Sequence, residues 1–285
     1  MKVEKKKKVV VKPKIAINAE ADVPNGYHEL TQLPSKLKLY NDGAKIFARP
    51  LKMLEIKQLT SLNEDNYSFI IDNVLKSTTI LHNLEFDDIL TADKLYIIFW
   101  ERANTYQGDG FSVKFNCESC MDKAIEDSER TGVELSRKEL SDIASSKYDF
   151  NVSNLQLQDI RDDYDPNFEL ELKTSGHTMT LYQHTIGIEK RMSEVILNKE
   201  LPNADIDFLT LASVISSING EQVDIAKAYS YLINDCAPAD YIVIEKYKKD
   251  YDINIDPVLK VNCKKCGGEV EAPLSFHSDF FLPST

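Results

Sequence analysis

The chain has 285 residues, of which 42% are hydrophobic and 28% are charged, so it is long enough to bury one or two cores and disorder throughout is excluded. The formal net charge is −12, but residues 1–14 carry seven lysines against one glutamate, which leaves +6 in this segment and −18 in the rest. An acidic body repels phosphate backbones, which argues against nucleic-acid binding by the folded part.

The sequence has no segment typical of membrane insertion or export. Its longest uninterrupted apolar run, Leu95–Trp100, is far shorter than the roughly 20 residues that cross a bilayer. At the N-terminus only Val9–Val11 are apolar in succession, whereas a signal peptide needs about seven or more such residues. We therefore expect no membrane partner and a protein that stays in the compartment where it is made.

Residues 1–27 are predicted to form a basic extended arm, because Pro13, Pro24 and Gly26 interrupt any periodicity. The lysine run in this arm is typical of a solvated chain end, and the alternative is a segment that becomes ordered on a neighbouring subunit. Residues 28–285 are predicted to form an α+β body.

The first part of this body combines one strand with helices. Alternating apolar residues predict a strand at Lys45–Arg49. Helical spacing of apolar residues then predicts helices at Leu51–Leu62, Asn66–Leu75 and Thr91–Arg102. Thr91 is the expected N-cap of the third helix, because a threonine precedes its long apolar run.

Residues 122–147 are rich in Glu, Asp, Lys and Ser, which predicts a helical surface insertion between two strands, Phe111–Phe115 and Tyr148–Leu157. A hairpin is expected next, formed by Phe168–Leu172 and Met179–Tyr182. Further helices are predicted at Gly187–Asn198, Ile206–Ile215, Glu221–Leu232 and Ala239–Lys249. The predicted fold class is therefore α+β, a mixed helical body with short antiparallel strands.

Four of the five cysteines form two Cys-x-x-Cys pairs, Cys117 with Cys120 and Cys263 with Cys266. In a chain without an export signal, such pairs indicate a metal site rather than disulfides. The spacing allows two thiolates to lie about 2.3 Å from one tetrahedral zinc ion. We therefore predict a four-cysteine zinc ribbon, formed jointly by residues 111–121 and 258–276.

The surroundings of the second pair fit this prediction better than those of the first. Gly267 and Gly268 allow the positive φ angles that turn backbone amides toward the sulfurs, whereas Met121 follows the first pair. Four thiolates leave no open position for a substrate, so the zinc is predicted to be structural. The alternative, a thioredoxin-like redox pair, needs its motif at a helix start after a strand. Cys236 is predicted to be a small buried residue.

No catalytic residue and no other cofactor site is predicted, so we expect a protein that is not an enzyme. The five histidines form no metal-binding spacing, and the common phosphate-binding and nucleophile motifs are missing from the sequence. The acidic run Asp159–Asp165 lacks the glycine and the final glutamate of a calcium loop, which favours a solvated loop. Phe280 and Phe281 near the C-terminus are expected to be held by the protein's own core or by a partner's groove.

The order of these features resembles the baseplate hub and hub assembly proteins of T-even-type contractile-tailed bacteriophages. The resemblance spans residues 33–284, and its parts, in order, are Leu33-Pro34-Ser35, Arg49-Pro50, residues 86–106, the two cysteine pairs and residues 280–284. The sequence departs from the family pattern in the insertion after the first cysteine pair, in the missing glycine there, and in the basic arm.

This resemblance implies a structural or assembly protein of a phage tail baseplate hub, present in the host cytoplasm during assembly and in the virion if it stays. Its partners would be other baseplate and tail proteins, with self-association as a further option. By the resemblance only Cys117, Cys120, Cys263 and Cys266 acquire a role, as zinc ligands. The alternatives from other classes are a zinc-ribbon nucleic-acid-binding regulatory protein and an enzyme with an unrecognised site.

Overall fold

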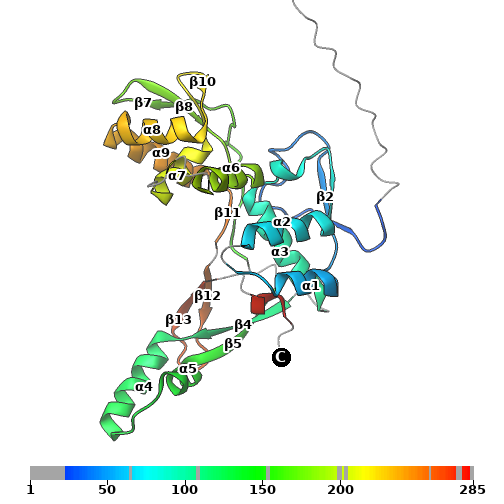
Figure 1. Ribbon diagram of the computed structural model, residues 1–285. Coiled ribbons are helices and arrows are strands. Elements are labelled where there is room, and N and C mark those ends of the chain that lie inside the picture. Colours follow the sequence, from blue (N-terminus) through cyan, green and yellow to red (C-terminus); the bar gives the residue numbers. More distant parts are fainter. Residues whose placement is uncertain are drawn as a thin grey trace, which may run out of the picture.

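The structure is a computed structural model, and it describes residues 23–63, 66–106, 110–151, 155–197, 201, 205–256, 258–273 and 278–282. Over these residues the fold combines helices with antiparallel strands, as predicted. Three parts are distinguishable in Figure 1: a central body, a second body, and an arm that projects away from both. Most of the predicted basic arm, residues 1–22, lies outside the described residues.

The central body combines a three-stranded sheet, in the order β1-β2-β3, with helices that cover it. The strands and helices are β1 (His28–Glu29), β2 (Lys45–Ala48), α1 (Met53–Leu59), α2 (Tyr67–Thr78), β3 (Thr79–His82), η1 (Phe86–Asp88) and α3 (Thr91–Thr105). Helix α3 runs through the centre of this body, and Ile97 and Phe99 are almost fully buried. The long apolar run of α3 therefore supplies core contacts on most of its sides.

Three local predictions in the central body need correction. Helix α1 is shorter than Leu51–Leu62. Thr91 is the first helical residue and not the N-cap, because Leu90 before it is extended and pairs with Thr185. Strand β3 was missed, since it follows α2 directly with no turn residue to mark the change.

The second body has its own sheet, in the order β10-β9-β8-β7, and its own buried core. Its elements are β7 (Leu170–Leu172), β8 (His177–Leu181), α6 (Ile186–Leu197), α7 (Ile206–Val214), β9 (Ile215–Ile218), β10 (Glu221–Gln222), α8 (Ile225–Asn234) and α9 (Pro238–Tyr251). The predicted helix Glu221–Leu232 is wrong in its first turn. Asn219 and Gly220 both have positive φ and form the turn of the β9–β10 hairpin, and Asp224 then caps α8.

A buried lysine joins the two bodies. Lys94 of α3 lies 2.9 Å from a carboxylate oxygen of Asp72 in α2 and 2.9 Å from one of Glu189 in α6. Helix α6 also packs against η1. The two bodies are further linked by the short ladder of β6 (Leu157–Gln158) with β11 (Asn254–Ile255).

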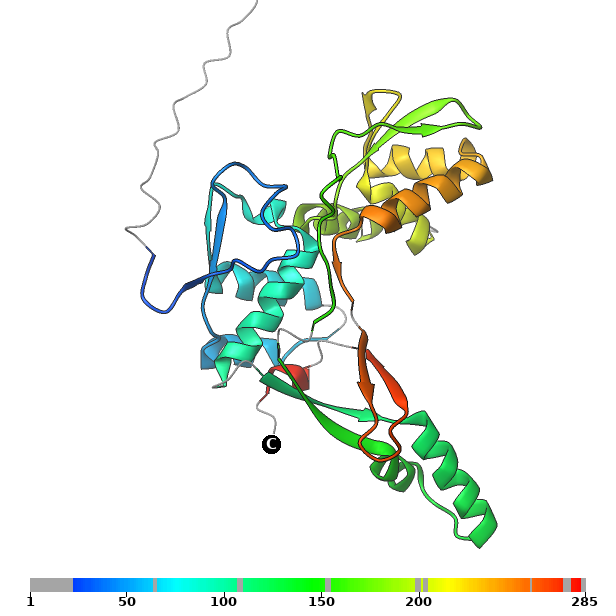
Figure 2. The same ribbon diagram turned by 180° about the vertical axis from the view of Figure 1, so that it is seen from behind.

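The projecting arm is built from two β-ribbons and a helical hairpin, and both views show it extending from the central body (Figures 1 and 2). Its elements are β4 (Gly110–Asn116), α4 (Glu118–Thr131), α5 (Arg137–Ala144), β5 (Ser145–Asn151), β12 (Val258–Asn262) and β13 (Glu269–Pro273). Strand β4 pairs with β5 from Gly110↔Asn151 to Asn116↔Ser145. The expected insertion at 122–147 is helical, but its first helix already begins at Glu118.

The chain then returns to the central body as η3 (Ser278–Phe281), where Phe281 is buried. The prediction that the protein's own core holds this segment is confirmed. Among the described residues, no helix is both long enough and apolar enough to cross a membrane.

Candidate metal centre

The four sulfur atoms predicted to bind zinc lie within 4.8 Å of one another, at the point where the two β-ribbons of the arm meet α4. The Cys117 and Cys266 sulfurs are 3.6 Å apart, and the Cys120 and Cys263 sulfurs are 3.7 Å apart. A tetrahedral ion with metal–sulfur bonds of about 2.3 Å places its sulfurs about 3.8 Å apart. The cluster can therefore hold one metal ion such as zinc.

The second cysteine pair sits in a tight turn between β12 and β13. The Cys263 amide donates to the Gly268 carbonyl at 2.7 Å, and the Gly267 amide donates to the Cys263 carbonyl at 2.8 Å. Gly267 has a φ of +76°, which confirms the role expected for this glycine, whereas Gly268 has no positive φ. The amides of Lys265 and Gly268 lie 3.4 Å from the sulfurs of Cys263 and Cys266. The backbone thus supplies donors to both thiolates.

The first cysteine pair has a different setting from the one predicted. Cys117 is the N-cap of α4, and Cys120 lies in the first helical turn. The Cys117 amide donates to the Ala144 carbonyl at 3.0 Å, and the Cys117 carbonyl accepts from the Met121 amide. A helix start needs no positive φ, which explains why Met121 stands where a glycine was expected. The positive end of the helix dipole favours thiolates at this place.

The thiols of Cys117, Cys120 and Cys263 differ in their acidity. Backbone amides, chiefly those of Cys266 and Lys265, lower the pKa of Cys263 to about 6. Burial and the neighbouring thiols raise the pKa of Cys120 to about 12, and burial also raises the pKa of Cys117. Four adjacent thiolates repel one another, so a divalent cation is what would keep all of them deprotonated.

The four cysteines also differ in burial. Cys117 and Cys263 are buried, Cys120 is partly buried and Cys266 is exposed. Cys236 is no part of the cluster; it is only partly buried, and its thiol lies 3.6 Å from the Ala237 carbonyl oxygen.

Two lysines between Cys263 and Cys266 hold the turn in place, and sequence reasoning missed them. The Lys265 ammonium donates to the carbonyls of Asp142 and Ile143 in the last turn of α5. The Lys264 ammonium donates to the Lys147 carbonyl and lies 5.1 Å from the centre of the Tyr148 ring. Basic side chains commonly satisfy the last carbonyls of a helix, which is the signal that could have identified Lys265.

The remaining candidate residues occupy structural positions. His184 lies between Thr91 and Ser213. His28, His82 and His177 each contact one aromatic ring, those of Trp100, Phe47 and Tyr231. His277 lies outside the described residues.

In the acidic run, Asp159, Asp162 and Asp163 form ion pairs with Lys36, Lys38 and Arg161. Asp162 and Asp163 are exposed and Asp159 is partly exposed, in agreement with a solvated loop.

The centre as a whole is a closed set of four thiols, contributed by one helix start and one β-turn. Its inner sulfurs pack against Phe115, Val261 and Val270. The fold therefore brings all four predicted ligands together, although the two cysteine pairs are at least 143 residues apart in the sequence. Comparison with protein-family models, with curated proteins and with solved structures finds no match to this chain.

Proposed function

We propose that this chain is a structural or assembly protein of a contractile-tail baseplate hub, held together by a structural zinc ion and acting through protein–protein contacts. The observation that carries the proposal is that most of the motifs behind the resemblance contact one another, at three junctions. Each junction fastens two segments that are far apart in the sequence.

The first junction joins Leu33-Pro34-Ser35 to α3. The carboxylate of Asp93 is fully buried, and it accepts from the Ser35 amide at 3.0 Å and from the Ser35 hydroxyl at 2.5 Å. The Tyr40 hydroxyl donates to the same carboxylate at 2.5 Å. A buried carboxylate with three donors holds its loop in one conformation.

The second junction joins the C-terminal segment to the end of α3. Arg102 donates from Nε to the Phe280 carbonyl at 2.5 Å and from Nη2 to the Leu282 carbonyl at 2.8 Å. The Tyr106 hydroxyl donates to the Phe281 carbonyl at 2.9 Å. Three successive carbonyls are thus bound by side chains of one helix and the residue after it.

The third junction is the cluster of four cysteines. Cysteine-only sites favour zinc among the common divalent ions, and four thiolates close the coordination shell. A zinc ion at this site would be bound by two thiolates from a helix start and by two from the β12–β13 turn. Only the turn has the backbone expected of a zinc ribbon, and the helix start is a variant of it. Its chemistry would be that of a staple, since apparent zinc affinities of about 10 kcal/mol or more become folding free energy.

The alternative, a nucleic-acid-binding regulator, draws no support from the lysines of the turn. The ammonium groups of Lys264 and Lys265 are engaged by backbone carbonyls of β5 and α5. A phosphate would have to displace these contacts and approach a chain whose net charge outside residues 1–14 is −18.

Mass spectrometry of purified virions and of tail intermediates from infected cells tests the proposal. We expect the chain in the intermediates, and its presence in virions at the copy number of other hub proteins would identify a subunit rather than a transient assembly factor. Absence from both samples would refute the proposed function. If the proposed function is wrong in this way, a matched infection with a phage that lacks the gene should also yield normal baseplates.

A further inference from the structure

Two sulfur contacts of the metal centre cross between the segments that it joins. The Cys117 sulfur lies 3.6 Å from the Cys266 sulfur, and the Cys120 sulfur lies 3.7 Å from the Cys263 sulfur. A disulfide bond is about 2.05 Å long, so each contact has to shorten by only about 1.6 Å to become covalent. Each such bond would join the start of α4 to the β12–β13 turn, as the metal ion would.

Each crossing contact combines an accessible cysteine with a buried one. Cys266 is exposed and its partner Cys117 is buried, while Cys120 is partly buried and its partner Cys263 is buried. Reaction with an oxidant in solution requires access to the sulfur, so Cys266 is the first cysteine that such a reagent meets. A buried sulfur then lies beside it, in position to complete a disulfide.

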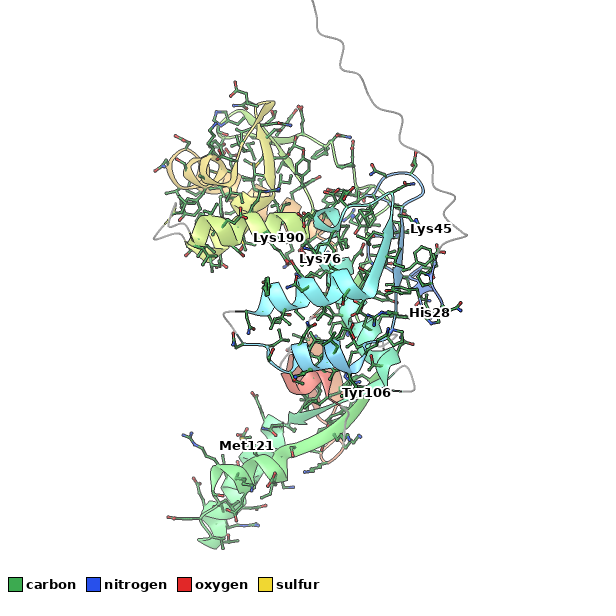
Figure 3. The ribbon with its side chains drawn as sticks, turned by 45° about the vertical axis from the view of Figure 1, so that its right-hand side comes forward. His28, Lys45, Lys76, Tyr106, Met121 and Lys190 are labelled. Carbon is green, nitrogen blue, oxygen red and sulfur yellow. The ribbon has the colours of Figure 1, made fainter. Side chains whose placement is uncertain are left out.

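A groove of about 520 Å³ leads to both accessible cysteines. Cys120 and Cys266 line it together with Lys123, Lys265 and apolar residues of α4, α5 and the loop between these helices. Met121, the residue after Cys120, marks this place in Figure 3, on the projecting arm and below the central body. A groove of this volume has room for a small disulfide reagent at the Cys266 sulfur.

The first cysteine pair also has the local setting of a redox-active pair. Cys117 follows strand β4 and is the N-cap of α4, and Cys120 lies in the first turn of that helix. A helix start after a strand is the setting that a thioredoxin-like Cys-x-x-Cys pair needs. The difference is that each sulfur here also contacts a sulfur of a distant segment, so disulfides can form between segments as well as within one.

We infer that two disulfides, Cys117 with Cys266 and Cys120 with Cys263, replace the zinc ion under oxidising conditions and keep the projecting arm braced. The exchange rests on the zinc staple of the proposed function, and it is independent of the place of the chain in a baseplate. Thiols persist in a reducing cytoplasm, whereas disulfides are stable outside it. The two segments would therefore stay fastened in both surroundings.

The exchange uses a small disulfide, RSSR, as the oxidant. The Cys266 thiolate attacks RSSR, which forms a mixed disulfide on Cys266 and releases one RS⁻. The Cys117 thiolate then attacks the Cys266 sulfur, which forms the Cys117–Cys266 disulfide and releases the second RS⁻. A second RSSR converts Cys120 and Cys263 in the same way, so two RSSR are reduced to four RS⁻ and the chain releases one zinc ion.

Disulfide mapping of the full-length, zinc-loaded chain after treatment with oxidised glutathione tests this exchange. Free thiols are blocked, and cleavage after glutamate and after lysine separates all the cysteines for mass spectrometry. We expect release of one zinc ion per chain, a first glutathione adduct on Cys266, and then the Cys117–Cys266 and Cys120–Cys263 disulfides. Cys236, which is outside the cluster, is the internal control and should react at least tenfold more slowly than Cys266.

The outcomes separate the exchange from the zinc staple. Disulfides within each Cys-x-x-Cys pair, a first adduct on a cysteine other than Cys266, or zinc release without disulfides would overturn the inference. A chain that binds no zinc but forms both crossing disulfides would refute the zinc staple and support the sulfur pairing. A zinc-loaded chain that forms neither disulfide would refute the exchange alone.

Hydrogen exchange of the arm supplies the independent readout. Each crossing disulfide joins residues at least 143 positions apart, and such a bond strongly restricts the unfolded chain. The amides of β12 and β13 should therefore be as protected in the oxidised chain as in the zinc-loaded chain, and they should exchange at least tenfold faster in the reduced chain after chelation of zinc. Cys236→Ser is the matched control and should give the same three results. Loss of protection on oxidation would refute the bracing by disulfides.

Discussion

Replacing Phe281 by alanine should loosen the C-terminal segment and weaken metal binding together. The Phe281 side chain is almost fully buried in the core of the central body, and its segment η3 packs against α1. Truncation of a buried phenylalanine to alanine costs about 3–5 kcal/mol of unfolding free energy. For a chain of this size such a loss lowers the melting temperature by on the order of 10 °C.

The link to the metal follows from the path of the chain. Strand β4, which ends next to Cys117, contacts α3, and the C-terminal segment, which follows β13 in the chain, binds Arg102 of the same helix. Docking of Phe281 therefore brings the two cysteine pairs closer together, and metal binding favours docking in return. We expect about tenfold weaker zinc affinity in Phe281→Ala, within the usual range of such coupling.

Chelator competition measures the affinity, and circular dichroism follows thermal unfolding. Leu282→Ala is the matched control, because its side chain is 41% exposed while its carbonyl still accepts from Arg102. It should change either quantity only slightly. Unchanged zinc affinity in a Phe281→Ala protein that melts at a lower temperature would refute the coupling, and equal effects of both variants would refute the assignment of the cost to the buried ring.

Three further predictions concern the metal centre and α3. Cys263→Ser should abolish binding of one zinc ion per chain and lower the melting temperature, whereas Cys236→Ser should keep the zinc content and the melting temperature of wild type. Atomic absorption measures the zinc content, and a wild-type value in Cys263→Ser would refute the assignment of Cys263 as a ligand. Lys265→Gln should increase hydrogen exchange in the last turn of α5 through loss of about 1.5–3 kcal/mol, since each hydrogen bond from a charged donor contributes about this much. The exposed substitution Lys123→Gln should not, and protection equal to wild type in both variants would refute the role of Lys265 in holding this turn. Burial raises the pKa of Glu101 to about 8, so the folded state retains a proton that the unfolded state releases. Wild type should therefore lose stability relative to Glu101→Gln as the pH rises from about 5 to 8, by up to about 1.4 kcal/mol per pH unit. Urea unfolding at each pH measures this difference, and parallel pH profiles of the two proteins would refute the prediction.

Spacing within short segments predicted part of the centre but not all of it. The Cys263–Cys266 turn was predictable because its strands and glycines are local signals. Cys117 and Cys120 are three residues apart, and this separation suits a helix start as well as a β-turn, since residues at i and i+3 share a helix face. The sequence pattern could not separate these two geometries.

Contacts between distant segments were the other limit. Arg102 and the carbonyl that it binds at Phe280 are 178 residues apart, and no periodicity encodes such a pairing. The β9–β10 hairpin differs, because Asn219-Gly220 is a strong local hairpin signal, and the helix predicted from Glu221 took no account of it. An overlooked local signal therefore accounts for this error, and long-range packing accounts for the unpredicted role of Arg102.

The projecting arm also has a mechanical consequence. Seven extended residues of β4 followed by fourteen helical residues of α4 give a lever on the order of 40 Å long. A rotation of about 10° at the base of such a lever moves its tip by about 7 Å, which exceeds the tolerance of a specific docking contact. Isolated two-stranded ribbons are only marginally stable. Bracing of β4–β5 by β12–β13 through a shared ion would thus set how accurately the tip of the lever is aimed.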